Sequence, residues 1–91
     1  MEKRVEIIIT GLVQDVNFRY YTREKAKQLS IVGYVKNIDN NKVEIVAEGD
    51  EDNLKQLADW SSHGPNYAHV INEKISWQQP TGEFNDFEVK Y

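Results

Sequence analysis

The residues most able to do chemistry in this sequence lie at the end of its first apolar segment. Residues 11–19 read Gly-Leu-Val-Gln-Asp-Val-Asn-Phe-Arg and lead from that segment into a region with helical spacing. Arg19 would therefore stand in the first turn of a helix, where the backbone dipole disfavours a positive side chain. A phosphate or similar oxyanion between the guanidinium and the helix end would reconcile the two, so the pattern indicates an anion-binding site.

Backbone N–H groups are expected to form the rest of this site. A loop that enters a helix leaves several N–H groups without partners, and together with the helix dipole they bind anions. Arg19 adds a planar guanidinium that suits bidentate phosphate binding. The alternative is a surface arginine that pairs with Glu24 or with nothing. The candidate phosphate-binding residues are Gln14, Asp15, Val16, Asn17, Phe18 and Arg19.

Hydrophobic periodicity predicts the elements that would position this loop. Apolar residues alternate at period two in the expected strands and recur at spacings of three and four in the expected helices. The order is β-α-β-β-α-β with a short C-terminal strand. It predicts an α+β fold, a ferredoxin-like split-βαβ sandwich with two helices on one face of a mainly antiparallel sheet. The expected strands cover 4–10, 31–38, 42–49, 67–77 and 86–91, and the expected helices cover 18–30 and 51–62.

Cap and turn residues are expected at the ends of these elements. Asn17 and Asp50 are suitable N-caps, because their side chains can accept hydrogen bonds from the first helical N–H groups. Residues 39–41 read Asp-Asn-Asn and are expected to make a hairpin turn, since asparagine tolerates positive φ angles. Gly64 and Pro65 would end the second helix.

The composition excludes or disfavours several classes of protein. The chain has 91 residues, no cysteine and a formal net charge of −4, so disulfides and thiolate chemistry are absent and broad nucleic-acid affinity is disfavoured. RNA-binding domains share the predicted fold, but they stack bases on strand aromatics, and residues 42–49 contain none. There is no metal-ligand spacing and no apolar run of about 20 residues. We expect one domain over residues 1–91, in the cytoplasm, without nucleic-acid or membrane partners.

Two motifs resemble those of the acylphosphatase family, whose small ferredoxin-like members hydrolyse acyl phosphates to a carboxylate and phosphate. The first family motif, G-x-V-Q-G-V-x-F-R, is matched at residues 11–19 except at Asp15. The second, roughly G-aromatic-V-K-N-x-x-x-G-x-V and a glycine six residues on, is matched at residues 33–49 except at Asn41. The matching residues are Gly11, Val13, Gln14, Val16, Phe18 and Arg19, then Gly33, Tyr34, Val35, Lys36, Asn37, Val43 and Gly49, and later Gly64, Pro65, Ala68 and Val70.

This resemblance implies a site and a mechanism. The N–H groups of the 14–19 loop and the side chain of Arg19 would hold the phosphate, and Asn37 would orient the attacking water, which makes Arg19 and Asn37 the expected catalytic residues. The family uses no metal, no cofactor and no covalent phosphoenzyme. The expected substrate is a small acyl phosphate, the product is inorganic phosphate and the state is a monomer. From local pattern alone, Asn37 reads as a polar residue that ends a strand.

Asp15 is the important departure from the family pattern. It replaces a glycine inside the proposed anion site, where a positive φ would strain an aspartate. Its carboxylate would also repel a dianionic phosphate group. We therefore expect a weakened enzyme, and the alternative is an inactive acylphosphatase-like module that binds an anion without turnover.

Overall fold

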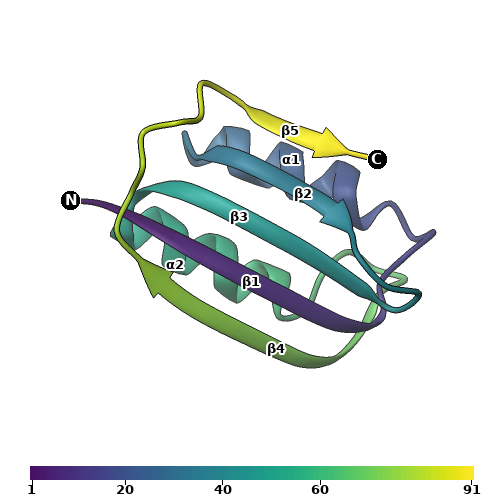
Figure 1. Cartoon of the computed structure of the whole chain (residues 1–91). Coiled ribbons are helices and arrows are strands. Elements are labelled where there is room, and N and C mark those ends of the chain that lie inside the picture. The colour runs from purple at the N-terminus through teal and green to yellow at the C-terminus, as the bar shows by residue number, and fades with distance from the viewer.

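Two helices cover one face of a five-stranded sheet in the computed structural model, which describes residues 1–91 (Figure 1). The strand order is β4-β1-β3-β2-β5, in which β5 runs parallel to β2 and every other neighbouring pair is antiparallel. The predicted α+β split-βαβ arrangement with an added C-terminal strand is confirmed. The elements are β1 (Glu2–Leu12), α1 (Phe18–Gln28), β2 (Val32–Asn37), β3 (Lys42–Asp50), α2 (Glu51–Ser61), β4 (His69–Gln78) and β5 (Phe87–Lys90).

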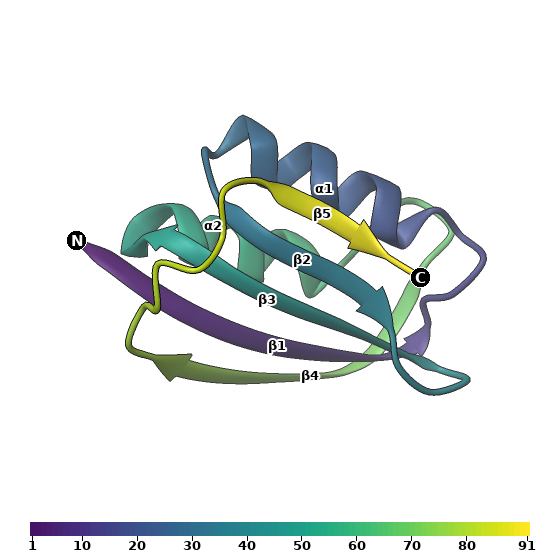
Figure 2. The ribbon, with the colours of Figure 1, turned by 45° about the horizontal axis from the view of Figure 1, so that its top comes forward.

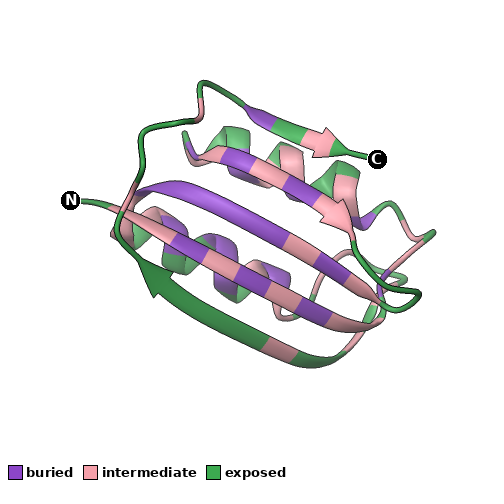
Figure 3. Cartoon of the chain, viewed as in Figure 1, coloured by how far each residue is buried: buried purple, intermediate pink, exposed green.

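The core lies between the helices and the two central strands, β1 and β3. Val5, Ile7 and Ile9 of β1 are buried and the residues between them are not, which gives the banded pattern of Figure 3. These residues pair in register with buried residues of β3, for example Ile7 with Ile45. Full burial of each such aliphatic side chain contributes roughly 1.5–3 kcal/mol. The helices complete the core from the other side with Phe18 and Ala26 of α1 and Leu54 and Leu57 of α2. Neither helix is long and apolar enough to cross a membrane.

The ends of three elements differ from the sequence predictions. Asn17 holds the N-cap position of α1 but makes no side-chain capping bond, because its backbone is left-handed (φ 62°) whereas side-chain capping uses an extended backbone. Asp50 meets that condition (φ −62°, ψ 138°) and caps α2. The hairpin turn predicted at 39–41 joins the antiparallel strands β2 and β3, but it contains no positive φ. It is closed by a bond from the N–H of Ile38 to the carbonyl of Lys42. β4 begins at His69, two residues late.

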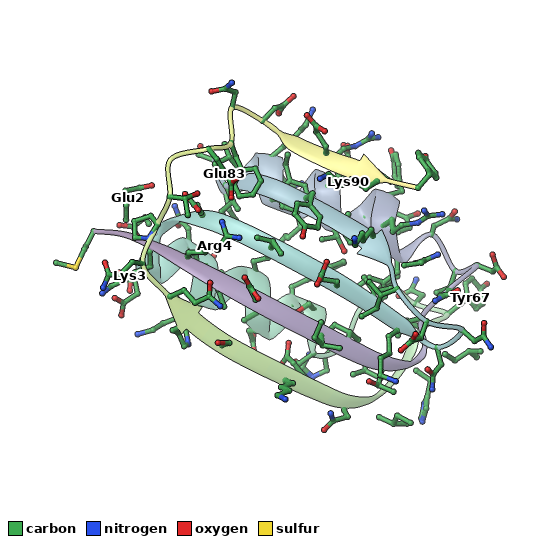
Figure 4. All side chains as sticks on the ribbon, in the orientation of Figure 1. Glu2, Lys3, Arg4, Tyr67, Glu83 and Lys90 are labelled. Atoms are coloured by element: carbon green, nitrogen blue, oxygen red, sulfur yellow. The ribbon has the colours of Figure 1, made fainter.

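The segment between β4 and β5 crosses the end of the sheet near the N-terminus (Figure 1). It is anchored by Glu48 of β3, whose carboxylate accepts hydrogen bonds from the N–H of Thr81 at 2.9 Å and the N–H of Gly82 at 3.0 Å. Arg4 of β1 donates to Glu48 and also to Glu83, both at 2.9 Å, and Figure 4 shows Arg4 and Glu83 close together. This network fixes the path of the chain into β5.

Candidate active site

A cavity of about 390 Å³ opens at the start of α1. The loop that precedes α1, the end of β2 and the end of β5 meet there, although they are distant in sequence (Figure 2). The lining residues are Val13, Gln14, Asp15, Asn17, Phe18, Arg19, Tyr20, Arg23, Asn37, Val89 and Tyr91.

The end of β1 and the loop that follows it are each fastened to the connection between β2 and β3. The N–H of Gly11 donates to the carbonyl oxygen of Asn41 at 2.9 Å. The side-chain amide of Gln14 donates to the carbonyl oxygens of Asp39 and of Lys42, the latter at 3.0 Å. The Gln14 side chain therefore holds the loop against β2 and β3, and of its N–H groups only the backbone N–H remains for a ligand.

The N–H groups of residues 14–19 have no partner within the chain. None of them donates a hydrogen bond to a backbone or side-chain acceptor, and the first helical bond runs from the N–H of Tyr21 to the carbonyl of Asn17 at 3.1 Å. Asp15 and Asn17 both have φ 62°. Left-handed residues in such a loop allow successive N–H groups to converge, which is the geometry of an anion-binding nest.

The two helices differ sharply at their N-termini. α2 begins with Glu51 and Asp52 and is capped by Asp50, so its positive end is already satisfied by carboxylates. The first turn of α1 has no acidic residue and instead carries Arg19. Because both the helix dipole and the guanidinium are positive, this end of α1 is suited to an anion from outside the chain.

Residues of the C-terminal strand hold the Arg19 side chain at the cavity. Its Nη1 donates to the carbonyl oxygen of Lys90 at 3.1 Å, and its Cζ lies 4.6 Å from the centre of the Tyr91 ring. That distance is within the range of cation–π attraction. Arg19 makes no ion pair with a carboxylate, and it is Arg23 rather than Arg19 that contacts Glu24. The alternative of a surface Arg19–Glu24 pair is therefore wrong.

Asn37 lines the same cavity and carries a side-chain oxygen without a partner in the chain. It is the last residue of β2 and lies opposite Val43 of β3. Its Oδ1 atom is buried and accepts no hydrogen bond from the chain. A buried acceptor without a donor is costly and rare in native structures, so this atom is expected to be satisfied by a bound water or ligand.

The cavity gathers most of the residues predicted from the sequence. Val16 is the exception, because it lines a separate depression beside Tyr21 and Trp60. The predicted residues that do line the cavity are Gln14, Asp15, Asn17, Phe18, Arg19 and Asn37.

Five residues around the cavity were not predicted as site residues, and one of them, Val13, was noted only as part of the family motif. Arg23 could have been found from the sequence, because it follows Arg19 by four residues and such pairs share a helix face. Tyr20 had no pattern to distinguish it from a surface tyrosine. Val89 and Tyr91 reach the cavity only because β5 pairs with β2, which is a tertiary fact without a local signature.

Comparison with known proteins identifies the family. The family model described as acylphosphatase matches residues 5–89. The chain belongs to the acylphosphatase family. An acylphosphatase from Geotalea uraniireducens is 38% identical over 91 residues, with 100% of both chains covered. One from Thermotoga maritima is 43% identical over 89 residues, with 98% of each chain covered. A crystal structure of acylphosphatase from Bacillus subtilis superimposes with a TM-score of 0.93 at 31% identity and covers 100% of both chains.

Asp15 remains the notable departure of this acylphosphatase-family chain. It supplies the only acidic side chain in the lining of the cavity, and its φ of 62° is the left-handed value that glycine adopts without strain. An aspartate in this conformation costs about 1–2 kcal/mol. Elsewhere, the chain has no group of three or more His, Asp or Glu side chains placed to hold a metal ion.

Proposed function

We propose that this chain hydrolyses acyl phosphates to a carboxylate and inorganic phosphate, as membership of the acylphosphatase family implies, and that it does so without a metal. The proposal rests on one cavity, which is lined by Arg19, by Asn37 with its unpaired Oδ1, and by every residue of the 14–19 loop except Val16. The six N–H groups of that loop have no partner within the chain. In this proposal residues 1–91 act as one domain and as a monomer.

The phosphoryl group binds at the start of α1 in this proposal. Its peripheral oxygens accept hydrogen bonds from the N–H groups of residues 14–19 and from the guanidinium of Arg19. These donors are in place before substrate arrives, since Lys90 and Tyr91 already hold the guanidinium. Preorganised donors stabilise charge on the phosphoryl oxygens in the transition state, which is the main requirement of phosphoryl transfer.

Asn37 orients the attacking water. Its Oδ1 accepts a hydrogen bond from the water and directs the water's lone pair toward phosphorus. The leaving group needs no proton donor, because a carboxylate whose conjugate acid has a pKa near ~4 departs unaided. Positioning and charge stabilisation therefore suffice, and neither a general acid nor a covalent intermediate is required.

Hydrolysis of benzoyl phosphate tests this proposal. Release of benzoate and phosphate is followed with and without an excess of a chelator such as EDTA. We expect turnover that the chelator does not change. Turnover abolished by the chelator and restored by a divalent cation would contradict the metal-independent mechanism.

A second candidate function is anion binding without turnover, and Asp15 is the observation that favours it. A carboxylate ~6 Å from a phosphate charge repels it by roughly 3 kcal/mol at an effective dielectric constant of ~20, less after salt screening. Saturable binding of inorganic phosphate, combined with no hydrolysis of benzoyl phosphate, would favour this function over the first.

A further inference from the structure

We propose that Arg23 determines substrate specificity by binding a carboxylate, or a similar anionic group, on the acyl part of the substrate. The inference rests on the proposed function, because it assigns the substrate class of the same cavity. It would direct the enzyme toward acyl phosphates whose acyl chain carries a second negative charge.

The charges around the cavity favour such a substrate. The chain contains three arginines, and two of them, Arg19 and Arg23, line this cavity. Asp15 is the only acidic side chain among the lining residues. The cavity therefore has a net positive lining on a chain whose formal charge is −4. One arginine is accounted for by the phosphoryl group, which leaves the other without an assigned ligand.

Arg23 lacks the partners that the other two arginines have. The guanidinium of Arg4 donates to Glu48 and Glu83, and that of Arg19 donates to the carbonyl of Lys90. Arg23 makes no hydrogen bond, and its Nε atom is buried without a partner. The Arg23 side chain as a whole is 35% exposed, and none of its N–H groups donates a hydrogen bond, so the rest of the guanidinium is suited to an acceptor that arrives with the ligand.

Glu24 does not fill this role. Its carboxylate lies 3.6 Å from the Nε of Arg23, beyond hydrogen-bonding distance, and its side chain is 47% exposed. Adjacent residues on a helix point in different directions, so Glu24 does not share the cavity face. The ring of Tyr20, whose centre lies 5.5 Å from the Cζ of Arg23, instead packs beside the guanidinium within the cavity.

The spacing of the two arginines separates their roles. Arg19 stands beside the free N–H groups that bind the phosphoryl group, whereas Arg23 lies one helical turn further along α1. Four residues of α-helix span about 6 Å. In an extended four-carbon acyl phosphate, five bonds of ~1.5 Å separate phosphorus from the terminal carbon, and their zigzag path covers about 6 Å. A carboxylate at the far end of such a chain would reach Arg23 and could accept bidentate hydrogen bonds from it.

The test compares succinyl phosphate with butyryl phosphate, which have acyl chains of the same length and differ by a carboxylate in place of a methyl group. We expect the wild-type chain to prefer succinyl phosphate by about tenfold in kcat/KM, mainly through KM, since binding of a remote group acts on KM. Arg23→Gln should remove this preference, by lowering kcat/KM for succinyl phosphate about tenfold more than kcat/KM for butyryl phosphate. Arg23→Lys, which retains the charge, should retain part of it.

Lys25→Gln is the matched control, because it removes the same charge from the same helix at a residue outside the cavity. Lys25→Gln should leave the preference for succinyl phosphate intact. Inhibition by inorganic phosphate should be the same in wild type and in Arg23→Gln. Butyryl phosphate hydrolysis without a preference for succinyl phosphate would overturn this inference and leave the proposed function standing. A loss of phosphate inhibition in Arg23→Gln would also overturn it, by making Arg23 part of the phosphoryl site. Hydrolysis of neither substrate would contradict the proposed function, and the inference with it.

Discussion

The guanidinium of Arg19 lies 4.6 Å from the centre of the Tyr91 ring, and its Nη1 donates to the carbonyl of Lys90. Lys90 is the last residue of β5 and Tyr91 comes directly after it. β5 pairs in parallel with β2. The last residue of β2 is Asn37. Two neighbouring strands therefore set the relative positions of the phosphoryl-binding cation and the side chain that we propose orients water.

Tyr91→Ala should weaken phosphate binding modestly, because Arg19 would lose the ring that packs against it. A cation–π contact at an exposed site is worth ~0.5–1 kcal/mol, so KM for benzoyl phosphate should rise about two- to fivefold. Tyr91→Phe keeps the ring and should behave as wild type. If the alanine and phenylalanine variants had equal KM values, the ring contact would have no role in holding Arg19.

Asn37→Ala should separate catalysis from binding. Loss of one preorganised catalytic group typically lowers kcat by ~10²–10³, whereas the inhibition constant of inorganic phosphate should stay near the wild-type value. Asn40→Ala, the same change in the exposed turn that follows β2, is the control and should alter neither constant. Weakened phosphate inhibition with an unchanged kcat would show that Asn37 binds substrate rather than water.

Asp15 can be tested for charge and for strain separately. Asp15→Asn removes the charge and keeps a side chain of the same shape, so it should lower KM for an acyl phosphate. Asp15→Gly should lower KM similarly and also stabilise the fold by about 1 kcal/mol, because glycine adopts φ 62° without strain. That gain corresponds to a rise of roughly 4–8 °C in Tm. Unchanged kinetics in both variants would show the carboxylate to be irrelevant to substrate binding.

The fold was predictable because local patterns and tertiary packing agree. Alternation in β1 and β3 predicted buried residues such as Ile7 and Ile45, and these pair in register. The exposed edge strand β4 begins two residues later than predicted, since most of its residues contact solvent and few apolar positions mark its start. The absence of a capping bond from Asn17 could not be predicted from the neighbouring sequence. Its backbone is left-handed as part of the loop before α1, rather than extended as in a capping residue.

The site was predictable only in part, because some of its contacts depend on the pairing of strands that are distant in sequence. The motif around Arg19 is contiguous in sequence, and the structure places most of it around one cavity. Gln14 was expected to contribute its N–H, and its side chain proves also to tie the loop to the β2–β3 turn. The contacts from Lys90 and Tyr91 depend on the pairing of β5 with β2 and have no sequence pattern of their own.

Glu48 should make stability depend on acid pH. Burial alone would raise the pKa of Glu48, but hydrogen bonds from the N–H groups of Thr81 and Gly82 and from Arg4 outweigh it and lower the pKa from an ordinary 4.5 to about 2. A carboxyl with a lowered folded-state pKa stabilises the fold above its unfolded-state value and loses that contribution as pH falls toward the folded-state value. The contribution is about 3 kcal/mol at neutral pH, since one pKa unit is ~1.4 kcal/mol.

Urea unfolding from pH 7 to pH 2.5 would check this dependence. The free energy of unfolding of wild type should fall across the range from 4.5 toward 2, and Glu48→Gln should be less stable than wild type at pH 7, with the gap closing in acid. Glu88→Gln, at an exposed residue of β5, is the control and should parallel wild type. A constant gap between wild type and Glu48→Gln would rule out titration of Glu48 as its cause.

The central claim is that free backbone N–H groups at the start of α1 and the side chain of Arg19 bind the phosphoryl group together. Titration of the ¹⁵N-labelled chain with inorganic phosphate, followed by amide chemical shifts, tests it most directly. The account predicts saturable shifts concentrated at residues 14–20 and much weaker binding in Arg19→Ala. Shifts scattered over surface lysines, or binding unaffected by loss of Arg19, would contradict it.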